Sequence, residues 1–211
     1  MNNVNDWIYF ISELDENICN KIKKIGTNKW ENSEVDKKTG EPTEEERKIG
    51  IKVISGENKE DRISDVAWTN EQWLYDTIWP VMEKVNDQAG WKYDIRSAEN
   101  MQITRYQKGG FYRFHSDGRG DHLSTYDEPK SKFKNGFVRK ISMTILLNEN
   151  FEGGEFQFST YTDQKCYVHS PPINKTGSII VFPSYMEHRI KPVTKGTRYS
   201  LVIWFLGPPF V

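Results

Sequence analysis

Cysteine is scarce in this sequence. The chain has 211 residues and two cysteines, Cys19 and Cys166, which do not form a CxxC pair. A disulfide framework needs several paired cysteines, and structural zinc sites commonly use clustered thiolates. Both are therefore excluded, and any metal must be held by histidine and carboxylate side chains.

Long apolar runs are absent as well. No stretch approaches the roughly 18 consecutive apolar residues of a membrane span. The opening MNNVNDWIYF also lacks the basic flank and apolar core of a secretion signal. We therefore expect a cytoplasmic protein of a bacterium or a virus, with no membrane partner.

Neither sign of charge is in excess. The 29 Lys and Arg residues are matched by 30 Asp and Glu residues, for a formal charge of -1. Proteins that bind nucleic acid through a bulk positive field carry an excess of Lys and Arg. A nucleic-acid partner is therefore disfavoured, and only the basic stretch 130–140 leaves a nucleic-acid demethylase open.

Two helices are predicted before residue 90. Apolar residues recur at helical spacing over 14–25, with Asp15 as the N-cap and Gly26 as the stop. A second helix follows Thr69, where Thr-x-x-Gln is a capping-box pattern, and it is expected to kink at Pro80.

The charged segment 31–62 lies between these helices. Glycine and proline interrupt it, and its apolar residues alternate only at Ile49, Ile51 and Val53. We expect a solvated loop around one short strand.

After residue 90 the pattern changes from helical to strand-like. Short runs rich in aromatic and β-branched residues alternate with turn residues, which predicts a sandwich or a barrel with both helices on one outer face. We expect a single domain over 1–211, with helical support at 1–100 and a β core at 101–207. The candidate strands are 101–106, 111–115, 141–147, 155–159, 178–182, 188–193 and 199–205.

Three side chains form a candidate metal site. His115 and Asp117 are two residues apart at the end of a predicted strand, so they point to the same face. His188 opens a later strand after the turn that Pro183 starts. Two histidines and one carboxylate leave about three open positions on an ion, as in non-haem Fe(II) oxygenases. Zinc is the competing metal, although structural zinc sites usually close with four protein ligands.

Arg198 is a candidate anion-binding residue. It lies in GTRYSLVIWF, where apolar neighbours imply a largely buried guanidinium. A buried arginine needs an anionic partner, and its planar fork suits a carboxylate. That partner is either a dicarboxylic co-substrate or an acidic residue of the protein itself.

The combined motifs closely resemble those of the Fe(II)- and 2-oxoglutarate-dependent dioxygenases, and within them the prolyl 4-hydroxylase-like group. The resemblance covers about residues 101–206, while FISELDENICNKI resembles the usual opening segment of that group. It implies a double-stranded β-helix, or jelly roll, with iron at its open end. The matching segments are MQITRYQKGGFYRFHSD, ISMTILLNENFEGGEFQF and GSIIVFPSYMEHRIKPVTKGTRYSLVIWF.

The resemblance also implies roles for individual residues. The catalytic iron ligands would be His115, Asp117 and His188, and the cofactors Fe(II), 2-oxoglutarate and O2, with ascorbate as an optional addition. Arg198 and Tyr106 would hold the distal carboxylate of 2-oxoglutarate, and Trp204 would line its pocket. One departure concerns this pocket, because Leu146 replaces the tyrosine that some relatives carry and makes the wall more apolar.

A second set of residues is expected to contact the substrate. Arg139 matches a position that contacts peptide substrate, although neighbouring lysines also allow a solvated basic loop, and Tyr112 is assigned to the same side. The polar segment 118–136 is either a lid over the substrate or an insertion. The two remaining histidines, His122 and His169, are predicted not to be ligands.

These observations favour a hydroxylase of a prolyl residue in a protein or peptide partner, which releases succinate and CO2. A hydroxylase of a free amino acid or small metabolite is the second interpretation. The third is a catalytically silent jelly-roll binding module, which would have no need for all four of His115, Asp117, His188 and Arg198.

Overall fold

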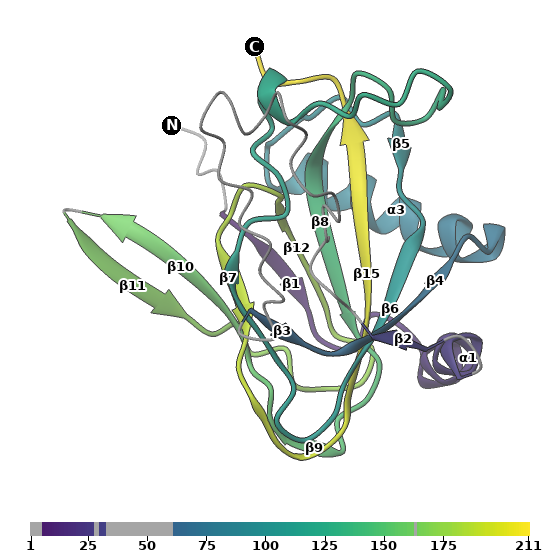
Figure 1. The fold of residues 1–211 in the computed structure, drawn as a ribbon, viewed down its shortest axis with the longest axis vertical. Helices are drawn as coiled ribbons and strands as arrows, with labels where there is room; N and C mark the ends of the chain where they lie inside the picture. Colours follow the sequence, from purple (N-terminus) through teal and green to yellow (C-terminus); the bar gives the residue numbers. More distant parts are fainter. Residues whose placement is uncertain (1–5, 28–29, 33–60, 163) are drawn as a thin grey trace, which may run out of the picture.

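The computed structural model describes residues 6–27, 30–32, 61–162 and 164–211. Two antiparallel sheets face each other and a third, small sheet closes one end (Figure 1). This is the arrangement of a jelly roll, as the sequence predicts. The strand expected at 49–53 lies outside the described residues.

The larger sheet has the order β1-β12-β8-β15-β6-β4-β2, and β5 also pairs with β15. Neighbouring strands are antiparallel. Its strands are β1 (Ile8–Phe10), β2 (Glu31–Asn32), β4 (Asp65–Thr69), β5 (Ser97–Ala98), β6 (Met101–Tyr106), β8 (Val138–Leu146), β12 (Ile179–Pro183) and β15 (Arg198–Gly207).

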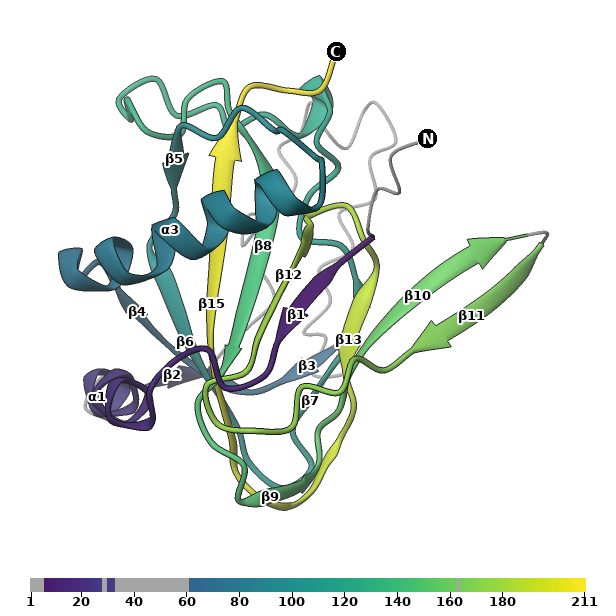
Figure 2. The same cartoon turned by 180° about the vertical axis from the view of Figure 1, so that it is seen from behind.

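The smaller sheet has the order β11-β10-β13-β7-β3, and β14 pairs with β9 at the closed end. Figures 1 and 2 show that the β10–β11 hairpin projects away from the body. The strands are β3 (Arg62–Ile63), β7 (Phe111–His115), β9 (Phe151–Gly153), β10 (Phe156–Thr162), β11 (Lys165–His169), β13 (His188–Ile190) and β14 (Val193–Gly196).

Both helices pack on the outer face of the larger sheet, as the sequence predicts (Figure 2). They are α1 (Glu16–Gly26) and α3 (Gln72–Gln88), which continues through Pro80. The predicted cap at Asp15 is confirmed, because its side chain accepts a hydrogen bond from the backbone N–H of Asn17. No helix of the described residues has the length and apolar character that a membrane crossing requires.

The predicted capping box at Thr69 is wrong. Thr69 is the last residue of β4, where it pairs with Met101, and the helix begins three residues later. Glu71 occupies the N-cap position without a side-chain bond to the helix. Sheet pairing therefore outweighs the local capping pattern here.

The segment before residue 100 does more than support the core with helices. It supplies β1 at one edge of the larger sheet and β2, β4 and β5 on the other side of β15. Of these, β4 pairs along its whole length with β6.

Strict alternation along the central strands separates two apolar layers. On β12, Ile179 and Val181 face the helices, whereas Ile180 and Phe182 face the smaller sheet. The same alternation on β15 points Arg198, Ser200, Val202 and Trp204 toward the space between the sheets. This inner space contains the candidate site.

Candidate metal and co-substrate site

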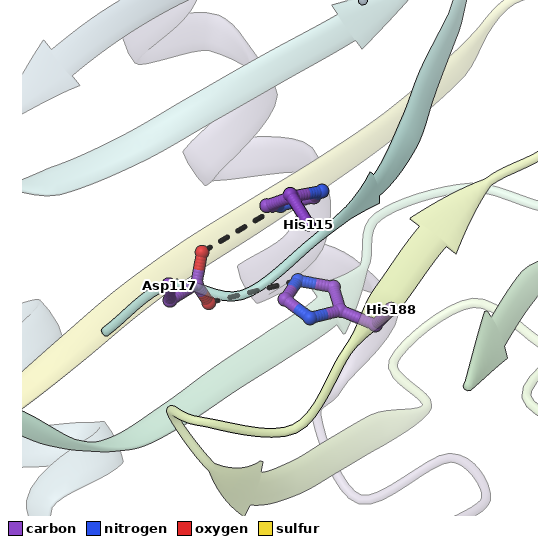
Figure 3. Close-up of side chains that lie close together, drawn as sticks. All are labelled: His115, Asp117 and His188. Carbon is purple, nitrogen blue, oxygen red and sulfur yellow. Dashed lines mark ion pairs between the residues drawn. The ribbon is translucent and has the colours of Figure 1, made fainter. Parts of the chain in front are cut away.

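His115, Asp117 and His188 converge at one end of the smaller sheet. His115 ends β7, His188 opens β13, and the two are direct partners across the antiparallel pair. Asp117 Oδ1 lies 3.6 Å from His115 Nε2, and Asp117 Oδ2 lies 3.6 Å from His188 Nε2 (Figure 3). One donor atom from each of the three residues lies within 4.8 Å of the others, so a single ion could contact all three.

The backbone fixes the orientation of both imidazole rings. His115 Nδ1 lies 2.8 Å from the carbonyl oxygen of Arg113, and His188 Nδ1 lies 2.9 Å from that of Met186. A carbonyl only accepts, so each Nδ1 carries the proton and each Nε2 keeps its lone pair directed at the centre. Such bonds from the second ring nitrogen are typical of metal-bound histidine.

The Asp117 carboxylate is held by a serine pair beneath it. Ser142 donates a hydrogen bond to Asp117 Oδ2 at 2.7 Å and lies 2.9 Å from the hydroxyl of Ser184. The Ser184 carbonyl accepts hydrogen bonds from the backbone N–H groups of Asp117 and Gly118, each at 3.0 Å. The turn that follows β7 is thereby tied to the end of β12.

The electrostatics favour the protonation states that a metal requires. Burial, followed by the proximity of His188, lowers the pKa of His115 to about 4. Burial alone would raise the pKa of Asp117, but the two imidazoles and Arg139 outweigh it and hold that pKa below its ordinary value. At neutral pH the site therefore offers a neutral His115 and an anionic Asp117.

This donor set fits a divalent metal with open positions. In the described part of the chain, no further cysteine, histidine or carboxylate joins these three side chains in a metal-holding group. A closed structural zinc site would need a fourth protein ligand. Two imidazoles and one carboxylate on one side of an ion match the facial arrangement of non-haem Fe(II) sites.

Arg198 lies opposite Tyr106 on the neighbouring strand β6. Its side chain is 2% exposed, donates one hydrogen bond to Ser200 Oγ at 3.0 Å, and places Cζ 5.7 Å from the centre of the Tyr106 ring. No carboxylate pairs with it among the described residues, and burial lowers its pKa to about 10. A buried guanidinium in this state is suited to an anionic ligand.

A cavity of about 310 Å³ connects these features. Ser200 and Tyr106 line it, and Arg198 lies behind them. Trp204 lines the cavity too, and its Nε1 is buried with no hydrogen-bond partner among the described residues. The other lining residues are Arg62, Trp68, Gln102, Tyr112, His115, Ser116, Asp117, Arg139, Thr144, Phe156, His188, Ile190 and Val202.

Tyr112 and Arg139, the two predicted substrate contacts, both line this cavity, and both already contact other side chains of the protein. The Tyr112 ring stacks on His115 with centroids 3.5 Å apart, and burial raises its pKa to about 12. Arg139 is ion-paired with Glu99, at 2.5 Å from Nε and 2.8 Å from Nη2. It also donates to the Asp117 carbonyl at 3.2 Å and lies over Trp204, so it is not part of a solvated basic loop.

The two histidines predicted not to be ligands lie apart from the metal group. His122 begins a short 3-10 helix (His122–Ser124), and His169 Nε2 lies 2.9 Å from the Thr160 hydroxyl. Leu146 is buried, on the same face of β8 as Thr144, which lines the cavity.

Sequence reasoning missed three residues of the site: Glu99, Ser142 and Arg62. Glu99 holds Arg139 from 40 positions away, and Ser142 holds Asp117 from 25 positions away. The alternation of β8 could have placed Ser142 on the inner face, since it is two residues from Thr144. Nothing local marks Glu99 or Arg62.

Comparison with known proteins agrees with this geometry. Residues 101–206, half of the chain, match the family described as the 2OG-Fe(II) oxygenase superfamily. The chain belongs to this superfamily. Together with the three metal-facing side chains, membership implies Fe(II) and 2-oxoglutarate as cofactors.

Similar curated proteins within the superfamily are named PKHD-type hydroxylases. One from Thermosynechococcus vestitus is 35% identical over 108 residues, covering 48% of this chain and 40% of that protein. Another, from Idiomarina loihiensis, is 29% identical over 111 residues, covering 52% and 43%. The matches thus span about two fifths of the length of these relatives.

Solved structures share the whole fold at low sequence identity. A Pseudomonas putida prolyl-4-hydroxylase has a TM-score of 0.61 at 17% identity, covering 95% of this chain and 91% of that one. A prolyl hydroxylase from Trichoplax adhaerens, in complex with a peptide fragment, has a TM-score of 0.65 at 16% identity, covering 96% and 84%. These similarities support the jelly roll and extend it beyond residues 101–206.

Proposed function

We propose that this protein is an Fe(II)- and 2-oxoglutarate-dependent dioxygenase that hydroxylates a prolyl residue of a protein or peptide. The observation that carries the proposal is the facial group of His115, Asp117 and His188 in a cavity whose wall includes Ser200, the hydrogen-bond partner of the buried Arg198. The prolyl substrate is favoured because the structural neighbours named above are prolyl hydroxylases. The strands before residue 100 complete the larger sheet, so we treat the whole chain as one functional domain.

Each part of the site has a defined task in this proposal. His115 and His188 bind the metal through Nε2, and Asp117 binds it through a carboxylate oxygen. When bound, Fe(II) and 2-oxoglutarate couple O2 activation to decarboxylation of the co-substrate, giving succinate, CO2 and the oxidising power for hydroxylation. Arg198 and Tyr106 hold the far carboxylate of the co-substrate. No side chain acts as a general base.

The cavity walls limit the access of water to this chemistry. Phe156 stacks on His188 with centroids 5.3 Å apart, and Phe182 contacts the same ring at 4.7 Å. Ile190 and Val202 extend the apolar surface. An apolar surround of this kind protects a reactive centre from side reactions.

Both cysteines are free, which suits the reducing cytoplasm expected for the protein.

The first test measures succinate formation by the purified protein with Fe(II), 2-oxoglutarate and O2. His115→Ala, Asp117→Ala and His188→Ala are each expected to abolish it, because each removes one of three metal ligands. His122→Ala is the matched control, since this histidine lies outside the metal group, and it should retain activity. Retained turnover in any of the three ligand variants would contradict the assignment.

The second test addresses the substrate. Proline-containing peptides incubated with the complete reaction are examined by mass spectrometry for the gain of one oxygen atom, and the oxidised residue is located by fragmentation. Oxidation at proline supports the prolyl assignment. Oxidation only at other residues, or only of free amino acids added in parallel, would replace it while leaving the dioxygenase proposal intact.

A further inference from the structure

Arg62 is a pocket residue with no role in the chemistry described so far. It begins β3, where it pairs with Tyr112 of β7. Its guanidinium lies over the Tyr112 ring at 4.7 Å, and that ring in turn stacks on His115 at 3.5 Å. Arg62 therefore places a permanent positive charge near the metal ligand His115, from which only the Tyr112 ring separates it.

The hydrogen bonds of Arg62 fix its guanidinium without neutralising it. Nε donates to Ser64 Oγ at 2.8 Å, and Nη2 donates to Gln102 Oε1 at 2.9 Å. Both partners are uncharged, and Nη1 makes no hydrogen bond to the described residues. The side chain is thus held in one orientation, and its Nη1 edge faces no acceptor of the described residues.

Other arginines in the same region have acidic partners. Arg139 is paired with Glu99 at 2.5 Å, Arg105 with Asp65 at 2.8 Å, and Arg113 with Asp61 at 3.5 Å. Arg62 has no ion pair among the described residues. Of the two arginines that line the cavity, it is the one whose charge no acidic side chain of the described residues meets.

The Arg62 position differs from that of the co-substrate anchor. Arg198 is buried behind Ser200 and Tyr106, whereas Arg62 is half-buried. Gln102, which holds Arg62, lies four residues along β6 from Tyr106, the partner of Arg198, or about 13 Å between their Cα atoms. A five-carbon dicarboxylate spans at most about 6 Å between its terminal carbons, less than the separation of Gln102 and Tyr106 along β6. A co-substrate anchored at Arg198 therefore leaves Arg62 to a second ligand in this interpretation.

A neutral donor lies in the same part of the cavity. Trp204 Nε1 has no partner among the described residues, and the residue is only 7% exposed. Its strand neighbour Val202 is the β15 partner of Gln102. The cavity thus presents a charged donor, which β3 supplies and Gln102 of β6 holds, and a neutral donor on β15, the neighbour of β6. This arrangement suits an oxygen-rich anionic group.

We propose that Arg62 forms a carboxylate subsite for the primary substrate, beside the metal ligands and separate from Arg198. Resting on the dioxygenase function proposed above, it specifies the substrate class: a peptide with an Asp or Glu side chain next to the hydroxylated residue. The α-carboxylate of a free amino acid offers the same chemistry, and the experiment below distinguishes the two sources.

The test measures binding and does not require turnover. The probes are an array of fluorescent peptides that differ in their central residue, with one pair of peptides for each amino acid. In each pair the central residue is flanked by Glu in one peptide and by Gln in the other. Binding is measured with the Mn(II)-loaded 211-residue chain and N-oxalylglycine, which occupies the co-substrate site without reacting. The wild type should bind the Glu form of its preferred peptide more tightly than the Gln form by about tenfold or more. Free amino acids and their amides are then added as competitors.

Three variants connect the preference to Arg62. Arg62→Gln should abolish the preference for Glu, Arg62→Lys should retain part of it, and Arg62→Glu should shift the preference to peptides flanked by Lys. Arg113→Gln is the matched control, because that arginine follows Tyr112 on the outward side of β7. The control should keep the wild-type preference. Circular dichroism establishes that each variant is folded.

The outcomes separate this proposal from the function on which it rests. Equal binding of Glu and Gln peptides by the wild type, no binding by either form, or the same preference in Arg62→Gln overturns the subsite. A further result is that free amino acids bind, their amides do not, and no peptide binds. The carboxylate recognised by Arg62 would then belong to a small metabolite, and the peptide assignment is overturned. Failure of the wild type to form succinate overturns the dioxygenase function, whatever the array shows.

Discussion

The Glu99–Arg139 pair provides the sharpest test of how the site is held together. Glu99 is 6% exposed and accepts from Arg139 Nε at 2.5 Å, from Arg139 Nη2 at 2.8 Å and from the Tyr126 hydroxyl at 2.6 Å. Burial lowers the pKa of Arg139, but Glu99 more than offsets it, so the net pKa is raised. Glu99→Gln removes this charge and replaces one acceptor with a donor that faces the guanidinium.

The expected loss of stability follows from the burial of the pair. Removing one partner of a buried ion pair costs about 3–5 kcal/mol. Arg139 keeps its bond to the Asp117 carbonyl and its contact with Trp204, so we expect the lower end, about 3 kcal/mol. For a domain of this size each kcal/mol lowers Tm by about 2–4 °C, which predicts a fall of roughly 10 °C. Metal affinity should also fall, by about tenfold, because Arg139 without its carboxylate partner holds Asp117 less firmly.

The assay is calorimetric unfolding of the metal-free protein, with Mn(II) titration for the affinity. Glu152→Gln is the matched control, since its partner Lys195 lies 2.7 Å away in a solvent-exposed pair and should contribute under about 1 kcal/mol. The double variant Glu99→Gln with Arg139→Met should recover part of the stability, because it no longer leaves an unpaired guanidinium. If Glu99→Gln and Glu152→Gln shift Tm equally, the reasoning is refuted.

Three further predictions concern single side chains. Ser142→Ala should weaken Mn(II) binding by about tenfold, measured by calorimetry, because Asp117 Oδ2 loses its donor; unchanged affinity would contradict this. Arg198→Met should raise the KM for 2-oxoglutarate by about tenfold or more while metal affinity changes little, and an unchanged KM would count against the anchor. Iodoacetamide at pH 8 should label exposed Cys166 alone, because burial raises the pKa of Cys19 to about 11; two adducts on the native protein by mass spectrometry would refute this.

Much of the β core could be predicted from local patterns. The predicted bounds of β6 and β7 agree with the structure, because apolar alternation and flanking turn residues coincide there. The metal group could be predicted for the same reason. His115 and Asp117 are close in sequence. His188 reaches them because β13 pairs antiparallel with β7 in a register that places His188 opposite His115.

Residues whose roles depend on long-range contacts could not be predicted. Glu99 looks like any acidic residue in a polar stretch, and only the fold brings it to Arg139 and Tyr126. Arg62 is the last residue of the charged segment 31–62, whose composition predicts a solvated loop, yet the pairing of β3 with β7 places it at the cavity. The short strand β4 was missed because a five-residue run beside charged residues has no clear period.

The segment 118–136 has consequences for the thermodynamics of binding. Its ends and middle are fastened to the body: Gly120 accepts from the Phe210 N–H at 2.8 Å, Tyr126 donates to Glu99, and the Phe133 carbonyl accepts from Ser97. A segment held in this way has already lost its conformational entropy before any ligand arrives. A partner that contacts it should therefore bind without the additional change in heat capacity that accompanies coupled folding.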